Sequence, residues 1–263
     1  MSNPFSVFWK YRLTIVKLIF IDLRKDRFNS FLGFAWVILN PLLTTLLVWG
    51  VVHFGFKANA SNVQNFPIWF LSAYLPWIFL SSAIQQGTLV FLEQSFLLKK
   101  IVFPAEILPL VKILSQGLIH LAFLTAFFAF LLFSGIAFSF AQFYVLVYFL
   151  IAVLLCYSIC LLTSFVTIYF RDISYLVGIF FQFGFWVTPI FWDLEIFSKE
   201  IQFFLKLNPF CGIVLGYRNA LLHPDSLVLL DSDFAYILFF TLFSLVLNWF
   251  LFQKAKRGLA EVL

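Results

Sequence analysis

The sequence contains long runs without charge, and the first of them, residues 28–56, has no Asp, Glu, Lys or Arg. A helix needs roughly 20 apolar residues to cross the hydrocarbon core of a bilayer, which is about 30 Å thick. Six runs meet this requirement, over residues 35–55, 66–86, 107–133, 143–167, 174–191 and 234–252. The alternating strands of about ten residues that are typical of a membrane β-barrel are missing. The sequence therefore predicts an all-helical integral membrane protein with six transmembrane helices.

The composition favours a single membrane domain. Of the 263 residues, 63% are hydrophobic and 11% are charged, whereas about 25% of the residues of a soluble domain are charged. No repeat or low-complexity linker divides the chain, so we expect one domain over residues 1–263, with the six-span bundle over residues 31–263. The formal net charge is +5, but the cations flank apolar runs instead of gathering on one face. Nucleic acid is therefore not an expected partner.

The positions of the cations predict the orientation of the chain. In a six-span chain most of them lie on one side of the membrane: Lys10, Arg12, Lys17, Arg24, Lys25, Arg27, Lys99, Lys100, Arg171, Lys254, Lys256 and Arg257. The opposite side holds Lys57, Lys199, Lys206 and Arg218. Cytoplasmic segments carry the excess of Lys and Arg, so both termini are expected in the cytoplasm. Lys112 lies inside the third run, and its side chain is expected to snorkel to the end of that span.

Two segments outside the spans are predicted to be helical. In residues 1–30, apolar residues are interleaved with cations, a pattern typical of an amphipathic helix lying in the cytoplasmic interface. An ordinary solvated segment is the alternative. The external connection, residues 192–233, contains two apolar-polar pieces that predict two short helices at the outer interface. A further hairpin across the membrane is the alternative there, and the charges of the first piece disfavour it.

Several signs of catalytic or ion-coupled chemistry are missing. The sequence has no G-x-x-x-x-G-K-[ST] phosphate loop, so no ATP or other cofactor is expected in this chain. The predicted spans have no Asp or Glu in their centres, which argues against a proton- or cation-driven transporter. We expect His53 and His120 to make interhelical hydrogen bonds, and a proton relay is the alternative. The three cysteines, Cys156, Cys160 and Cys211, are expected to be buried as small apolar residues.

A membrane-embedded glycosyl or acyl transferase is the alternative from another functional class. Such an enzyme needs a carboxylate pair, a His-Asp pair or a metal-ligand cluster. The best candidate is Asp231-Ser232-Asp233, which lies on the predicted external side, just before the last span. There, Asp and Ser are the residues that cap a helix N-terminus, and we expect this role for them.

Three stretches of the sequence resemble one protein family. They are residues 30–42 (SFLGFAWVILNPL), residues 96–110 (FLLKKIVFPAEILPL), and residues 171–218, with Arg171-Asp172, Thr188-Pro189-Ile190 and Asn208-Pro209-Phe210. In this order they are similar to the type-2 ABC exporter permeases that move lipid-linked polysaccharides such as O-antigen, teichoic acid or capsule. The resemblance extends over nearly the whole chain.

The resemblance implies a permease subunit in the bacterial inner membrane. It implies a dimer with a second copy of the chain and two ATP-binding cassette subunits, which bind the ATP and Mg²⁺. The substrate would be a lipid-linked polysaccharide, and the helix over residues 5–25 would contact the ATPase. Exporters of lipo-oligosaccharide, drug or lipid are the alternatives within transport.

The resemblance also implies the site residues. An ATPase-coupling and cytoplasmic-gate element would contain Gln94, Phe96, Leu97, Lys99, Lys100, Phe103 and Pro104. An external gate would contain Phe197, Phe204, Asn208, Pro209, Tyr217 and Arg218.

Two further groups of residues are singled out on physical grounds. Aromatic faces suit stacking on sugar rings, so we expect channel-lining roles for Trp36, Trp49, Phe181, Phe185 and Trp186. A charge pair of Arg171 and Asp172 is expected to anchor the tight turn between the fourth and fifth spans.

Overall fold

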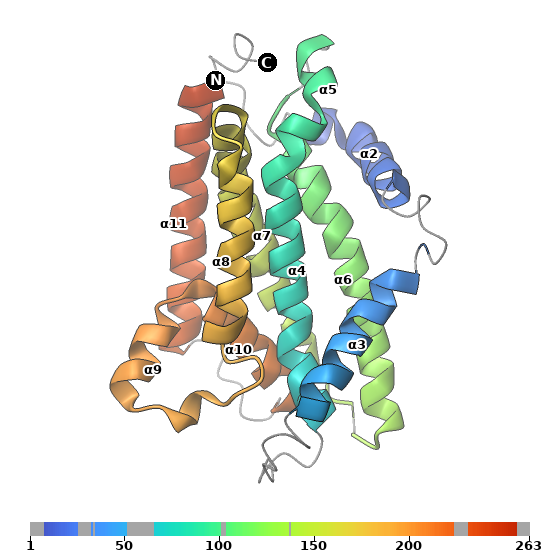
Figure 1. The fold of residues 1–263 in the computed structure, drawn as a ribbon, viewed down its shortest axis with the longest axis vertical. Helices are drawn as coiled ribbons and strands as arrows, with labels where there is room; N and C mark the ends of the chain where they lie inside the picture. Colours follow the sequence, from blue (N-terminus) through green and yellow to red (C-terminus); the bar gives the residue numbers. More distant parts are fainter. Residues whose placement is uncertain are drawn as a thin grey trace.

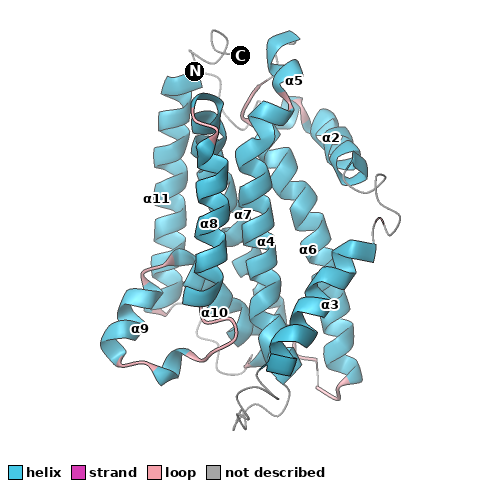
Figure 2. Cartoon of the chain, viewed as in Figure 1, coloured by secondary structure: helices cyan, strands magenta, loops and turns pink. Residues whose placement is uncertain are grey.

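The computed structural model of the chain describes residues 8–25, 33, 35–51, 66–100, 104–136, 138–223 and 231–256. All regular elements in these residues are helices, as Figure 2 shows. They are α2 (Arg12–Lys25), α3 (Ala35–Gly50), α4 (Phe66–Glu93), α5 (Ser95–Lys100), α6 (Ile107–Phe133), η2 (Phe140–Tyr144), α7 (Val145–Tyr169), α8 (Asp172–Val187), η3 (Leu194–Ile196), α9 (Lys199–Lys206), α10 (Pro209–Leu222) and α11 (Ser232–Ala255). The all-helical prediction is confirmed for the described residues.

Four helical segments are long and apolar enough to cross a membrane: Phe66–Glu93, Ile107–Phe133, Phe140–Tyr169 and Ser232–Ala255. The apolar helices α3 and α8 have 16 residues each, or about 24 Å at 1.5 Å per residue. That length is shorter than the bilayer core of about 30 Å. The chain is therefore a multi-pass membrane protein with four candidate spans in its described part, and the count of six stays a prediction.

The long helices lie side by side between two ends of the molecule (Figure 1). The short helix α5 marks one end, and α9 and α10 mark the other; we call these the α5 end and the α9 end. Successive long helices, from α4 through α6, α7 and α8 to α11, run in alternating directions between these ends. Connections between neighbouring long helices therefore fall alternately at one end and the other.

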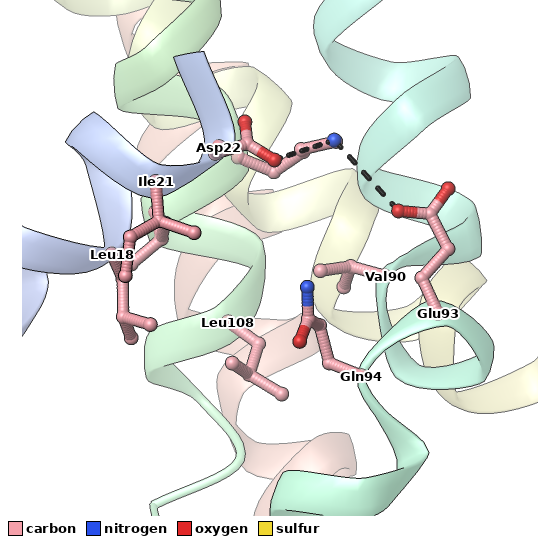
Figure 3. A pocket seen from close by; sticks show the side chains of 9 residues that line it. Leu18, Ile21, Asp22, Val90, Glu93, Gln94 and Leu108 are labelled. Carbon is pink, nitrogen blue, oxygen red and sulfur yellow. Dashed lines mark hydrogen bonds and ion pairs between the residues drawn. The ribbon is translucent and has the colours of Figure 1, made fainter. Parts of the chain in front are cut away.

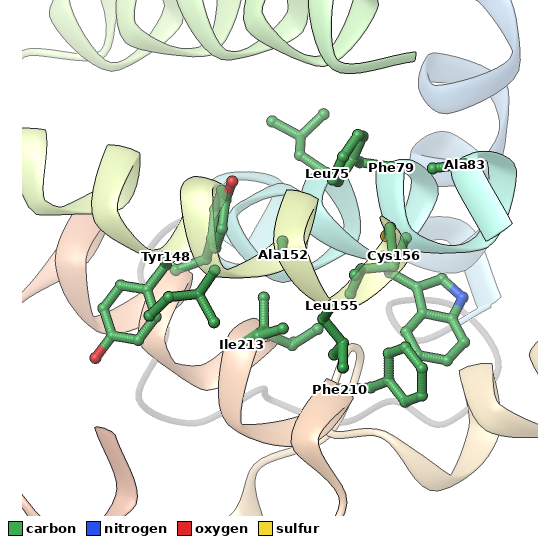
Figure 4. Close-up of a cluster of buried hydrophobic side chains, with 14 of the residues drawn as sticks. Leu75, Phe79, Ala83, Tyr148, Ala152, Leu155, Cys156, Phe210 and Ile213 are labelled. Atoms are coloured by element: carbon green, nitrogen blue, oxygen red, sulfur yellow. The ribbon is translucent and has the colours of Figure 1, made fainter. Parts of the chain in front are cut away.

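The core lies where α4, α7 and α10 meet, as the cluster in Figure 4 shows. Small residues let these helices approach closely, as is usual in membrane bundles. At Gly216 on α10, an added Cβ would lie 2.1 Å from a ring carbon of Tyr148 on α7. The three cysteines are buried free thiols, as predicted. The close approach of α10 to α7 therefore depends on the absence of a side chain at Gly216.

Some helix ends differ from the predicted limits. Helix α4 continues to Glu93, beyond the predicted end at Gln86, because Gln86 is satisfied inside the bundle: its Oε1 accepts a hydrogen bond of 3.0 Å from Gln116 Nε2. Helix α8 ends at Val187, short of the predicted residue 191. Pro189 explains this end, since a proline forces the preceding residue out of the helical region, and Thr188 has φ −80° and ψ 140°.

Other expectations about helix ends are confirmed. The carboxylate of Asp231 caps α11 by accepting a 2.7 Å hydrogen bond from the Phe234 backbone N–H. Residues 192–223 contain the helices α9 and α10, together with the single turn η3, while their place at the outer interface stays a prediction. The predicted amphipathic segment forms α2, whose residues Ile15 and Ile19 pack on α6. Residues 1–7 and 26–30 of that segment lie outside the described residues, and the place of α2 in the cytoplasmic interface stays a prediction. His53 also lies outside the described residues.

Candidate functional site

At the α5 end, a single residue, Gln94, separates the end of α4 at Glu93 from the start of α5 at Ser95. We call this junction, together with α5, the elbow. The backbone carbonyl of Gln94 accepts hydrogen bonds from Leu97 and Leu98, which start α5 directly after the last turn of α4. Leu97 packs against the main core, and Phe96 points outward with 61% of its surface exposed. The carbonyl of Pro104 then accepts a 3.1 Å hydrogen bond from Ile107 and begins the turn into α6. The elbow therefore presents the exposed side chain of Phe96 between the end of α4 and the start of α6.

The structure describes less of the other residues that were predicted for the coupling element. Lys99 and Lys100 close α5, but their side chains lie outside the described residues, as does all of Phe103.

Behind the elbow, Lys112 of α6 is buried with two acids. Its Nζ lies 2.8 Å from Asp22 Oδ1 on α2 and 3.8 Å from Glu93 Oε2 on α4. The expectation that Lys112 snorkels is wrong, because the side chain is only 5% exposed and its charge is met inside the protein. Burying an ammonium group is costly unless it is paired. The pairs of Lys112 therefore join three helices.

Glu106, the residue just before α6, also makes contacts with α7 and with the residue after α11. Lys256 Nζ, just after α11, lies 3.3 Å from Glu106 Oε1, and Tyr157 of α7 donates a 3.2 Å hydrogen bond to the Glu106 carbonyl. Ion pairs thus connect the start of α6 to α2 and α4 through Lys112, and to the end of α11 through Glu106.

At the α9 end, two predicted gate residues are buried side by side on α10. Tyr217 Oη lies 3.0 Å from His120 Nε2 on α6, which confirms the interhelical hydrogen bond expected for His120. Arg218 donates a 2.7 Å hydrogen bond to the Ile190 carbonyl, and its guanidinium lies 3.7 Å from the ring centroid of Trp69 on α4. Burial lowers the pKa of Arg218 to about 10, so it stays protonated at neutral pH. These contacts attach α10 to α4, α6 and the segment after α8.

The other predicted gate residues lie nearby in the sequence but not in this cluster. Asn208 caps α10, where its Oδ1 accepts a 3.0 Å hydrogen bond from the Phe210 N–H, and Pro209 occupies the first turn. Phe197 and Phe204 are exposed on the segment that contains η3 and α9. An ion pair of Lys206 with Asp233 ties α9 to the start of α11. The predicted gate residues therefore divide into a buried anchor and an exposed apolar surface.

The predicted channel aromatics divide into three groups by burial. Phe181 is buried within the chain, with its ring centroid 5.5 Å from those of both Trp77 and Phe210. Phe185 and Trp49 are partly buried against the core. Trp36 and Trp186 are exposed. The channel-lining role stays a prediction, and the two exposed tryptophans are the best placed to meet a molecule outside this chain.

Arg171 and Asp172 stand at the start of α8, as the N-cap residue and the first helical residue. Both are exposed, and no ion pair joins them in the described structure. Asp172 is well placed to interact with the helix dipole.

Comparison with known families identifies the chain. The sequence model of the ABC-2 type transporter family matches residues 15–222, a range that includes every helix from α3 to α10. The chain belongs to the ABC-2 type transporter family. Membership implies that this ABC-2 transporter chain is the membrane part of an exporter and works with an ATP-binding partner.

Individual relatives of this ABC-2 transporter are similar over most of their length. One is an O-antigen export system permease protein RfbA of Klebsiella pneumoniae, 24% identical over 245 residues, or 92% of each chain. A second protein of this name from the same organism is 25% identical over 245 residues. The RfbA permease of Myxococcus xanthus is 27% identical over 219 residues, or 80% of each chain.

Sequence reasoning misses the charged residues that surround the elbow of this ABC-2 transporter: Asp22, Glu93, Glu106 and Lys256. One signal was present, because Lys112 is a lone cation inside an apolar run and acids occur at the ends of the neighbouring segments. Which acid meets which cation depends on how the helices pack, and that is not visible in the sequence.

The hydrogen bond between Tyr217 and His120 predicts a measurable loss of stability. In Tyr217→Phe, a buried His120 nitrogen loses its partner, which should lower the free energy of unfolding by about 1–2 kcal/mol. Thermal unfolding of the purified chain in detergent measures the change. Tyr236→Phe is the matched control, because Tyr236 donates to the Leu207 carbonyl at an exposed position and its loss should cost less. Equal stability of Tyr217→Phe and the wild type would contradict the prediction.

Proposed function

We propose that the chain is the permease subunit of an ATP-driven exporter of lipid-linked polysaccharide, O-antigen or a teichoic-acid-like polymer, in a bacterial inner membrane. Two copies of the chain work with two ATP-binding subunits. The observation that carries the proposal is the similarity over 92% of each chain to permeases named for O-antigen export.

The charge distribution supports an orientation with the α5 end in the cytoplasm. Segments at the α5 end contain the described cations Lys10, Arg12, Lys17, Arg24, Arg171, Lys254 and Lys256, whereas the described segments at the α9 end contain Lys199, Lys206 and Arg218. Cytoplasmic segments are rich in Lys and Arg. Both termini are then cytoplasmic, and the elbow with α5 faces the ATP-binding subunits.

The arrangement of the helices supports distinct roles for the two ends. Helix α5 projects from the bundle with Phe96 exposed, which suits contact with the ATP-binding subunit. The exposed apolar surface with Phe197 and Phe204 forms the outer gate, while Tyr217 and Arg218 hold α10 in place. Trp36 and Trp186 offer aromatic faces to sugar rings, which stack on them through their C–H faces.

Removal of the chain from the organism tests the proposed function. Deletion should reduce surface polysaccharide at least tenfold, while lipid-linked polymer accumulates inside the cell. The wild-type chain should restore export only with an ATP-binding subunit that hydrolyses ATP. Unchanged surface polymer with loss of a drug or lipid export activity would favour the other transporters. Turnover of a donor sugar by the purified chain alone would favour a transferase.

A further inference from the structure

Helices α2 and α6 are joined into one unit behind the elbow. Ile15 and Ile19 of α2 form a small buried cluster with Ile107 and Val111 of α6, separate from the main core. The 2.8 Å ion pair of Asp22 with Lys112 lies beside this cluster, with side chains 11% and 5% exposed. A pair this well buried is hard to break, because separation would leave charges in an apolar setting. The two helices should therefore move together.

The contact of this unit with α4 is of a different kind. Glu93, the last residue of α4, is 36% exposed, and its carboxylate lies 3.8 Å from the Lys112 ammonium. This distance exceeds that of an ordinary hydrogen bond. Glu93 can withdraw toward solvent while Asp22 still pairs with Lys112, so no buried charge is left alone. Of the two ion pairs, the one with Glu93 is therefore the one that can open and close.

A cavity of about 60 Å³ lies at this junction, between α2, α4 and α6. Figure 3 shows Leu18 and Ile21 on one side of it, Val90 and Gln94 on the other, and Asp22 and Glu93 joined by dashed lines to one ammonium group between them. Close packing would transmit a displacement directly, but here side chains do not fill the space between the helices. The Glu93 to Lys112 ion pair therefore spans a gap in the packing.

We propose that Glu93 is a positioning residue for transport, whose ion pair with Lys112 links the α4–α5 elbow to the α2–α6 unit. This inference rests on the proposed function, in which an ATP-binding partner displaces α5. With the ion pair present, the α2–α6 unit follows the elbow. Without the carboxylate, the elbow moves into the cavity alone, and the displacement does not reach the bundle.

The substitution Glu93→Gln in the assembled exporter tests the proposal. It keeps the size of the side chain and removes the charge, so we expect ATP hydrolysis by the complex to continue while polymer exported per ATP falls at least fivefold. Glu93→Asp keeps the charge and should restore at least half of the wild-type ratio. Glu195→Gln is the matched control at an exposed position of the α9 end, and should leave the ratio unchanged. A wild-type ratio in Glu93→Gln would overturn the proposal.

Cross-linking provides a second measurement, which follows the movement of the helices instead of the exported polymer. Cysteines replacing Ile21 on α2 and Phe96 on α5, which are 60% and 61% exposed, are joined by a bifunctional maleimide. The native thiols are buried and should stay unreacted. In the wild-type exporter the yield should stay the same when ATP is trapped, because the α2–α6 unit follows the elbow, whereas in Glu93→Gln it should change at least twofold. A pair within the α2–α6 unit, Leu18→Cys with Leu114→Cys, should show no change.

These outcomes separate the inference from the proposed function. A wild-type complex that exports no polymer would refute the proposed function itself. Normal export together with a nucleotide-dependent yield for the α2–α5 pair in the wild type, or with a nucleotide-dependent yield for the α2–α6 pair, would refute the role of Glu93 alone.

Discussion

Gly216→Val is expected to destabilise the chain by about 3 kcal/mol, because it places a side chain where α10 touches α7. A Cβ at this position would meet three ring carbons of Tyr148 at 2.1, 2.5 and 2.6 Å. The ring has little room to move away, since Tyr148 is buried and packs edge-on against Phe234 with the centroids 5.7 Å apart. The backbone of α10 must therefore shift.

The displaced helix is expected to lose its polar contacts as well. Tyr217 and Arg218 follow Gly216 directly, so a shift of α10 weakens the hydrogen bond to His120 and the contact with Trp69. Thermal unfolding in detergent measures the loss of stability, and surface polysaccharide in complemented cells should fall at least tenfold.

Gly50→Val is the matched control, because no atom lies within 4 Å of the Cβ that it would add. Valine has a somewhat higher helix propensity than glycine, so this variant should be as stable as the wild type or slightly more stable. If both variants unfold at the wild-type temperature, the close approach of α10 and α7 does not contribute to stability.

Lys112→Met is expected to lower the free energy of unfolding by about 3 kcal/mol, since breaking a buried pair leaves an uncompensated charge. Methionine fills a similar volume, so the main change is the loss of the positive charge. Asp22, with 11% of its side chain exposed, would lose the ammonium group that lies 2.8 Å away. Glu93 should be affected less because it is 36% exposed and reaches solvent. The measurement is again thermal unfolding of the purified chain.

The double variant Asp22→Asn with Lys112→Met distinguishes the charge from the packing. It removes both charges of the buried pair, and such replacements are often nearly neutral. The double variant should therefore recover most of the stability that Lys112→Met loses, which a double-mutant cycle expresses as a coupling energy. A double variant as unstable as the sum of the single variants would show that the two residues act independently.

Local signals predict many features of this fold correctly. Apolar runs locate α4, α6, α7 and α11, and the interleaved cations of the N-terminal segment locate α2. Asp231 is recognised as a capping residue because its side-chain oxygen bonds a backbone N–H group close by in the sequence. Asn208 caps α10 in the same way, a role that was not predicted from the sequence. The end of a helix is predicted less accurately where contacts with a neighbouring helix determine it. Gln86 looks like the polar end of a span, but Gln116 satisfies it and α4 continues to Glu93.

The candidate sites also combine features that local sequence predicts with features that neighbouring helices determine. Similarity of motifs points to the elbow around Gln94 and to Tyr217 and Arg218, yet it does not reveal that Tyr217 pairs with His120 across 97 positions of sequence. Among the predicted aromatics, Phe181 is buried within the chain and Trp186 is exposed, although they lie on the same helix. A helix presents residues to all sides, and only its neighbours determine which of them remain exposed.

By itself, the sequence determined that this protein is helical and crosses a membrane, because backbone groups in lipid must be satisfied within each helix and charges must stay near the ends of the spans. Its motifs were also sufficient to indicate the transporter family. Only the tertiary structure decided that Lys112 lies between Asp22 and Glu93, and that Gly216 lets α10 rest on Tyr148. These contacts join residues far apart in the chain, so they depend on the packing of whole helices, which no local pattern specifies.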